Sequence, residues 1–191
     1  TDEANHMIQM AGAWMRPGYL APVLDFEDGN GVRTDQELTQ FALDFGNRIY
    51  AAMGIRPAIY INSAYAQNVL AGGTTTQRNQ LAQQASLPPG LATPPTFPTL
   101  WSARWPAGPG EPYLGDVQNE NPKDTYANVY GPWDDYGVQH PWSFWQYSSG
   151  GRLQSFNNGS QNINFNIANG GIEFLKDKLV PAVWMNNTSG D

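Results

Sequence analysis

An apolar segment, PVLDFED at residues 22–28, ends in three acidic side chains within four positions. Successive side chains of a β-strand point to opposite faces, so we expect Asp25 and Glu27 on one face and Phe26 on the other. Two carboxylates that share a small, partly buried volume repel each other, which favours one ionised and one protonated group. Acid catalysis of glycoside hydrolysis uses this arrangement. A strand that ends in a solvated acidic turn explains the spacing equally well.

The composition indicates one domain with a weakly charged surface that is rich in aromatic residues. The chain has 191 residues, of which 14% are charged and 13% are Phe, Trp or Tyr. This length is typical of a single domain. A surface of amides, hydroxyls and aromatic rings suits sugars. The net charge of -7 argues against nucleic acid as a partner, because phosphate binding needs a basic surface.

Several kinds of site are disfavoured by the residues that the chain lacks. It contains no cysteine, which excludes disulfides, thiolate nucleophiles and sulfur-ligated metals. Its two histidines, His6 and His140, have no partner at the spacing of metal ligands. No apolar run approaches the ~18 residues of a membrane span. We therefore expect neither a metal site nor a membrane span.

The hydrophobic periodicity predicts helices and strands in alternation. Apolar residues at spacings of three and four predict a helix over 3–15, and a T-x-x-E capping box at Thr34 begins a second helix that Gly54 ends. The expected strands are 22–26, 58–62, 99–103, 143–147 and 162–167, and the expected shorter helices are 64–71 and 171–179. This alternation is typical of an α/β fold with a parallel sheet.

Three segments occur in the order of a known family: PVLDFED at 22–28, LWSARW at 100–105 and WSFWQYSSGGRL at 142–153, with IYIN at 59–62 between the first two. The ordered set resembles glycoside hydrolase family 25, the Chalaropsis-type lysozymes or N-acetylmuramidases. The resemblance runs from about residue 5 to residue 178. It implies an irregular TIM-like (β/α) barrel with the active site at the carboxyl ends of its strands, and this chain covers about the last five strands.

On this resemblance, residues 1–179 form a catalytic domain without the family's first three strands, and 180–191 form a C-terminal tail. An N-terminal segment or another chain is expected to complete the barrel. The implied function is hydrolysis of the β-1,4 bond between N-acetylmuramic acid and N-acetylglucosamine in peptidoglycan. The implied location is extracellular or in the cell envelope, and no cofactor is implied.

The resemblance also assigns roles to residues. Glu27 resembles the general acid/base, and Asp25 resembles the carboxylate that stabilises the reacting 2-acetamido group. Apart from the resemblance, Asp28 is expected to cap a helix or a turn. The family's last motif usually reads V-D-x-N, whereas residues 163–166 read INFN, so Asn164 stands in the place of an aspartate. An amide carries no negative charge. A catalytically impaired module that binds glycan or has a structural role at the cell surface is therefore a second hypothesis.

Other side chains near the predicted strand ends are candidates for sugar binding. Aromatic faces stack on sugars, but an aromatic residue in a barrel strand is equally often part of the core. Arg104 either binds an acetamido oxygen or a substrate carboxylate, or forms a salt bridge at the rim. Gln146 either bonds a sugar or caps a strand end. The full expected substrate-binding set is Tyr60, Asn62, Trp101, Arg104, Trp145, Gln146 and Asn164.

Overall fold

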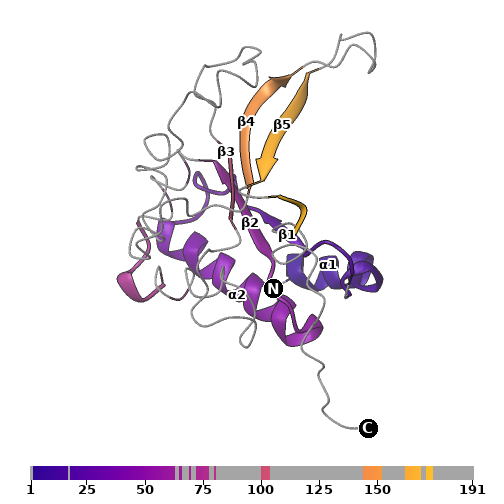
Figure 1. The fold of residues 1–191 in the computed structure, drawn as a ribbon. Helices are drawn as coiled ribbons and strands as arrows, with labels where there is room; N and C mark the ends of the chain where they lie inside the picture. The colour runs from indigo at the N-terminus through magenta and orange to yellow at the C-terminus, as the bar shows by residue number, and fades with distance from the viewer. Residues whose placement is uncertain are drawn as a thin grey trace, which may run out of the picture.

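The computed structural model describes residues 2–16, 18–62, 65, 69, 72–77, 80, 100–103, 144–151, 162–168 and 171–173. Helices and strands together form a mixed α/β fold, which confirms the predicted fold class (Figure 1). The elements are α1 (Asp2–Ala11), η1 (Gly12–Trp14), β1 (Val23–Asp25), α2 (Asp35–Met53), β2 (Ala58–Asn62), β3 (Leu100–Ala103), β4 (Phe144–Gly151) and β5 (Ile163–Ala168).

The five strands form one sheet in the order β1-β2-β3-β4-β5. Strands β1 to β4 run parallel, and β5 is antiparallel to β4. The prediction of a parallel sheet is therefore wrong for the last strand. Only a short stretch of chain separates Gly151 from Ile163, whereas a crossover between parallel strands usually contains a helix and a dozen or more residues. A short return favours the antiparallel arrangement.

Strand β1 lies at one end of the sheet and pairs only with β2 among the described strands. Its pairing continues past the strand itself, because the Phe26 N–H donates to the Tyr60 carbonyl oxygen at 2.9 Å. Strand β5 lies at the other end, so the described strands form an open sheet. Closure into a barrel stays a prediction.

Helix α2 begins and ends at the residues that the sequence predicted. The Thr34 hydroxyl accepts a hydrogen bond from the Glu37 N–H at 3.3 Å, and the Glu37 carboxylate accepts from the Thr34 N–H at 2.8 Å. This reciprocal capping box satisfies amides that have no partner within the helix. At the other end, Gly54 has φ 71° and donates its N–H to the Tyr50 carbonyl oxygen. A residue with a Cβ is disfavoured in this left-handed conformation.

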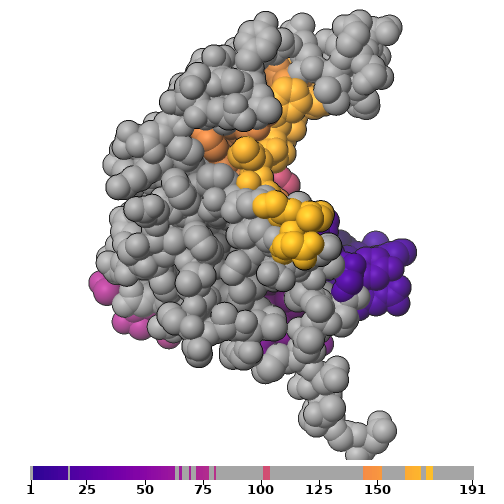
Figure 2. Space-filling model, in the orientation of Figure 1, coloured from indigo at the N-terminus to yellow at the C-terminus, as the bar shows by residue number. Residues whose placement is uncertain are grey.

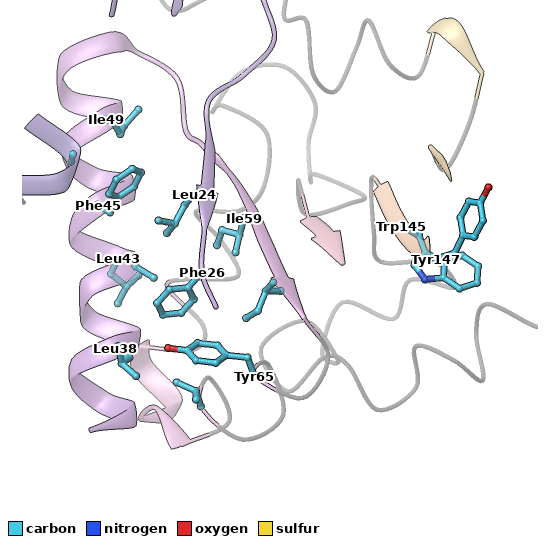
Figure 3. Close-up of a cluster of buried hydrophobic side chains, with 14 residues drawn as sticks. Leu24, Phe26, Leu38, Leu43, Phe45, Ile49, Ile59, Tyr65, Trp145 and Tyr147 are labelled. Carbon is cyan, nitrogen blue, oxygen red and sulfur yellow. The ribbon is translucent and has the colours of Figure 1, made fainter. Parts of the chain in front are cut away.

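The main core fills the space between α2 and the strands β1 and β2, as Figure 3 shows. The helix contributes Leu38, Leu43, Phe45 and Ile49, and the strands contribute Leu24, Phe26, Ile59 and Ile61. Phe26 lies 6.2 Å from Phe41 and 5.2 Å from Tyr65, measured between ring centroids. Full burial of a large apolar side chain contributes about 1.5–3 kcal/mol. The face of β1 that carries Leu24 and Phe26 is therefore fixed toward the helix.

The N-terminal helix is shorter than predicted. Helix α1 ends at Ala11, and the next three residues of the predicted helix, Gly12–Trp14, form the 3-10 helix η1. In Figure 2 the atoms of α1, in indigo, stand at the surface, and Ala4 is its buried residue. A side-chain bond from Arg48 Nε to Asn5 Oδ1 at 2.7 Å links α1 to α2. No described helix is both long and apolar enough to cross a membrane.

Part of the predicted organisation lies outside the described residues. This applies to the tail at 180–191 and to most of the predicted helices 64–71 and 171–179. Within the first of these helices, the Val69 N–H donates to the Tyr65 carbonyl oxygen at 2.8 Å, the spacing of one α-helical turn.

The capping box yields a stability prediction. Thr34→Ala removes the side-chain acceptor at the start of α2, so we expect the free energy of unfolding to fall by about 1 kcal/mol. Thr34→Ser keeps the hydroxyl and serves as the matched control, with stability close to that of the parent. Urea unfolding followed by circular dichroism measures both variants. Equal losses in the two variants would contradict the capping role.

The same bonds add a pH dependence. Hydrogen bonds from the Thr34 backbone and side chain lower the pKa of Glu37. A carboxyl group whose pKa is lower in the folded state stabilises the fold above its unfolded pKa, and this contribution is lost as the pH falls through the folded pKa. The stability difference between Thr34→Ala and the parent should therefore narrow in acid.

Candidate active site

Strand β1 directs Asp25 and Glu27 away from the core. Both carboxylates line one cleft of about 450 Å³ together with Val23, while Leu24 and Phe26 between them are buried. The expected arrangement, with both acidic side chains facing a common cleft at the carboxyl end of a parallel strand, is confirmed.

The expected partial burial of the two carboxylates is wrong. Asp25 and Glu27 are both exposed in the part of the chain that the structure describes. The reason lies in the sheet order, because β1 is the end strand and no described strand covers its outer side.

The strand register places three aromatic residues in a row beside the acidic pair. We call Tyr60, Trp101 and Phe144 the aromatic wall. Asp25 is opposite Tyr60, Tyr60 is opposite Trp101, and Trp101 is opposite Phe144. Residues in register share a face of the sheet, so these side chains form one row across four strands. The Tyr60 and Trp101 rings meet edge to face, with centroids 5.3 Å apart and planes at 84°. Both rings line the cleft.

Asn62 contacts Glu27 directly. Its Nδ2 donates to Glu27 Oε1 at 2.9 Å, and its Oδ1 accepts from the Tyr65 N–H at 2.8 Å. A backbone N–H can only donate, so this second bond fixes which end of the amide faces the carboxylate. The sequence placed Asn62 among the sugar-binding residues. The structure makes it a partner of Glu27, and its role in sugar binding stays a prediction.

Asp28 shapes the turn that follows β1. Its Oδ1 accepts from the Gly29 N–H at 2.6 Å, and its carbonyl oxygen accepts from the Tyr65 hydroxyl at 2.5 Å. Gly29 has φ 103°, and a Cβ at this position would meet Leu38 Cδ2 at 2.9 Å. The expected role of Asp28 in a turn is confirmed.

A second cleft of about 260 Å³ adjoins the first, because Asp25 and Glu27 line both. Arg33 and Phe41 also line this second cleft, and the Arg33 guanidinium lies 5.5 Å from the centroid of the Phe41 ring. The acidic pair thus stands between two hollows of unequal size.

Two side-chain amides on β4 and β5 hold the rings of the aromatic wall. The Tyr60 hydroxyl donates to Gln146 Oε1 at 3.2 Å, and Trp101 Nε1 donates to Asn166 Oδ1 at 2.8 Å. Gln146, Asn166 and the predicted Asn164 all line the larger cleft. Asn166 was missed by the sequence analysis. Its position two residues after Asn164 in a strand, which places both on one face, was the available signal.

The remaining candidates have different outcomes. Trp145 is 1% exposed and belongs to the core cluster, so its core interpretation is confirmed and its assignment to sugar binding is wrong. It alternates with Gln146 along β4, so the two side chains point to opposite faces.

Arg104 and His140 lie outside the described residues, and His6 is exposed on α1. Within the described ranges, no three histidine or carboxylate side chains could together hold a metal ion.

The cleft raises the pKa of Tyr60. Burial of the phenol is the largest cause, the charge of Glu27 adds to it, the bond to Gln146 opposes it and the charge of Asp25 contributes least. Burial and nearby anions both make ionisation of a phenol less favourable. Tyr60 therefore remains a neutral hydrogen-bond donor beside the acidic pair.

The chain is similar to solved structures of cell-wall enzymes. It matches the spore cortex lytic enzyme SleM of Clostridium perfringens with a TM-score of 0.56 and 19% identity, covering 90% of this chain and 44% of that chain. It matches a muramidase from Acremonium alcalophilum with a TM-score of 0.51 and 18% identity, covering 91% of this chain and 62% of that chain. The chain shares the fold of these enzymes.

A family 25 glycosyl hydrolase from Bacillus anthracis is also similar, with a TM-score of 0.46 and 16% identity over 83% of this chain and 54% of that chain. The chain thus spans between 44% and 62% of the length of these three structures. A muramidase among the neighbours agrees with the family that the sequence motifs resemble. No protein-family model matches the sequence, and no curated protein matches it.

The position of Tyr60 leads to a prediction. Glu27→Gln removes the anion with the larger effect on Tyr60, so the pKa of Tyr60 should fall, and Asp25→Asn should move it in the same direction by less. A pH titration of tyrosine ¹³Cζ signals measures the change, and Tyr60→Phe identifies the signal. Asp44→Asn, on α2 at the other face of the sheet, is the control and should leave the titration unchanged. If the pKa of Tyr60 were the same in Glu27→Gln as in the parent, the charge of Glu27 would not act on Tyr60 as described.

Proposed function

We propose that this chain acts as a peptidoglycan hydrolase that cleaves the β-1,4 bond between N-acetylmuramic acid and N-acetylglucosamine. The observation that carries the proposal is the pair Asp25 and Glu27, which line one cleft beside the aromatic rings of Tyr60 and Trp101. The shared fold with SleM and with a muramidase supports this class of reaction. The cell wall substrate implies action outside the cell or in the cell envelope.

Glu27 is the general acid that delivers a proton to the glycosidic oxygen. The amide of Asn62 donates to its Oε1, and the carbonyl oxygen of a carboxylic acid accepts hydrogen bonds better than its hydroxyl oxygen does. In this proposal the transferred proton is therefore carried on Oε2. Once the proton has left, the bond from Asn62 is charge-assisted and stronger, so it stabilises the ionised form that next acts as a general base toward water.

Asp25 supplies the second carboxylate. Its negative charge stabilises the 2-acetamido group as the nitrogen gains positive character during attack on the anomeric carbon. Two carboxylates on same-face positions of one strand are close together, which suits retention of configuration at that carbon. Both a covalent intermediate and substrate-assisted attack are compatible with this spacing.

The rest of the described cleft lining suits the sugar rings of a glycan strand. Tyr60 and Trp101 offer ring faces to the apolar faces of sugar rings. Asn164 and Asn166 line the cleft as well, and Asn164 offers an amide group for sugar hydroxyls. The described lining therefore combines acid catalysis with sugar binding.

A second candidate function rests on Asn164. This amide lines the cleft at a position where the resembled family usually has an aspartate, so the cationic transition state loses one stabilising charge. On this hypothesis the chain binds glycan with little or no turnover, as a binding or structural module of the cell surface.

Substitution of the acidic pair tests the proposed reaction. Glu27→Gln should abolish turnover, because an amide keeps the shape of the side chain but delivers no proton to the leaving oxygen. Asp25→Asn should lower kcat by about two to four orders of magnitude through loss of a preorganised charge. Release of reducing sugars from purified peptidoglycan measures turnover, and Asp44→Asn is the matched control.

Binding must be measured beside turnover. Both variants should still sediment with cell walls, because the aromatic wall is intact. A parent that sediments with cell walls but releases no reducing sugar, whatever substitution is made, would exclude the hydrolase and favour the binding module.

The amide at position 164 gives an independent test. Asn164→Asp restores a negative charge on the cleft wall, so we expect kcat on peptidoglycan to rise or to stay unchanged. Asn164→Ala, which removes the polar group without adding charge, is the comparison variant. A clear fall in kcat for Asn164→Asp alone would show that a charge here opposes the reaction, against the role inferred for the family's aspartate.

A further inference from the structure

We infer that Asn166 is a positioning residue that fixes the indole of Trp101 as a rigid wall for a sugar ring. The inference rests on the proposed function, because it specifies how the same cleft receives its substrate. Among the described side chains, Asn166 bonds to the indole of Trp101 and to neither acidic residue of the pair.

The bond from Trp101 Nε1 to Asn166 Oδ1, at 2.8 Å, joins two strands that are not neighbours in the sheet. Strand β4 lies between them, and on it Gln146 is directly opposite Asn166. Gln146 accepts a bond from the hydroxyl of Tyr60 on β2. Two facing amides thus each hold one ring, and both rings belong to the aromatic wall.

The other contacts of Trp101 leave its indole orientation dependent on Asn166. Tyr60 meets it edge to face on one side, and Phe144 lies 5.7 Å away on the other at 52°. Both contacts are apolar and restrict the ring without fixing its N–H edge. The indole N–H can only donate, and among the described side chains Asn166 is the one that accepts from it. The Asn166 bond supplies that acceptor and selects one orientation.

A ring held in one orientation favours binding. An immobilised side chain loses little conformational freedom when a ligand stacks on it, so preorganisation raises affinity. Because Trp101 does not touch the reacting proton, the effect of Asn166 should appear in KM and leave kcat almost unchanged.

A spectroscopic experiment tests the bond independently of activity. Hydrogen exchange of the Trp101 indole N–H is followed by ¹⁵N NMR, with Trp101→Phe to identify the signal. Asn166→Leu should accelerate this exchange, whereas Asn166→Asp, which keeps an acceptor, should keep the exchange rate close to that of the parent. Asn162→Ala, an exposed position just before β5, is the control. Equal exchange in Asn166→Leu and the parent would overturn the inference.

A kinetic experiment tests the consequence. For hydrolysis of solubilised peptidoglycan, Asn166→Leu should raise KM about 3- to 10-fold, the loss expected for one hydrogen bond, with kcat within about twofold. In a Trp101→Phe background, which already lacks the N–H, the same substitution should have no further effect on KM. A KM increase of equal size in both backgrounds would mean that Asn166 acts without Trp101, and an unchanged KM in the parent background would also refute the inference.

The two hypotheses fail in different ways. An inactive parent refutes the proposed hydrolysis, and the Kd for cell walls from sedimentation then replaces KM in the same comparison. An active parent with no coupling between positions 101 and 166 refutes the positioning role and leaves the hydrolase intact.

Discussion

The burial of Leu24 and Phe26 against α2 is the constraint on which the candidate site depends. Both side chains are almost fully buried, and Phe26 contacts aromatic rings from the helix and from Tyr65. A strand cannot bury neighbouring residues on one face, so Asp25 and Glu27 must face the cleft. The apolar contacts of the core therefore orient the acidic pair without touching it.

The same alternation extends across the sheet. On β2, Ile59 and Ile61 enter the core, while Tyr60 and Asn62 lie toward the acidic pair. Parallel register then brings Trp101 next to Tyr60. Hydrogen bonds from Asn62 and from the amides of β4 and β5 complete the arrangement. Core packing therefore determines which side chains face the cleft, and hydrogen bonds determine how each of these side chains is oriented there.

Features with local signals could be predicted from the sequence. The capping box at Thr34, the helix end at Gly54 and the strand 58–62 were all predicted to the residue, because each depends on neighbours within a few positions. The faces of Asp25 and Glu27 followed from strand alternation in the same way.

Features that depend on distant residues could not be predicted. The bond from Asn62 to Glu27 and the partnership of Trp101 with Asn166 each join segments far apart in the chain. The antiparallel direction of β5 is a different case, because the short connection after β4 favoured it and the alternation of helices and strands did not reveal it. The exposure of the carboxylates depends on what lies beside the end strand, and the sequence of β1 does not contain that information. For Trp145, the sequence was compatible with the cleft and with the core, and only the register of β4 shows that this side chain faces the core.

The strict alternation on β2 has a consequence for how the protein tolerates change. A substitution at Tyr60 or Asn62 alters one side chain of the cleft and leaves the hydrophobic core unchanged. Deletion of a single residue within the strand would shift every following position to the other face, sending the isoleucines toward solvent and the polar side chains toward α2. Point substitutions can therefore change ligand binding in the cleft one side chain at a time. A deletion of one residue inside the strand would disrupt the cleft and the hydrophobic core together.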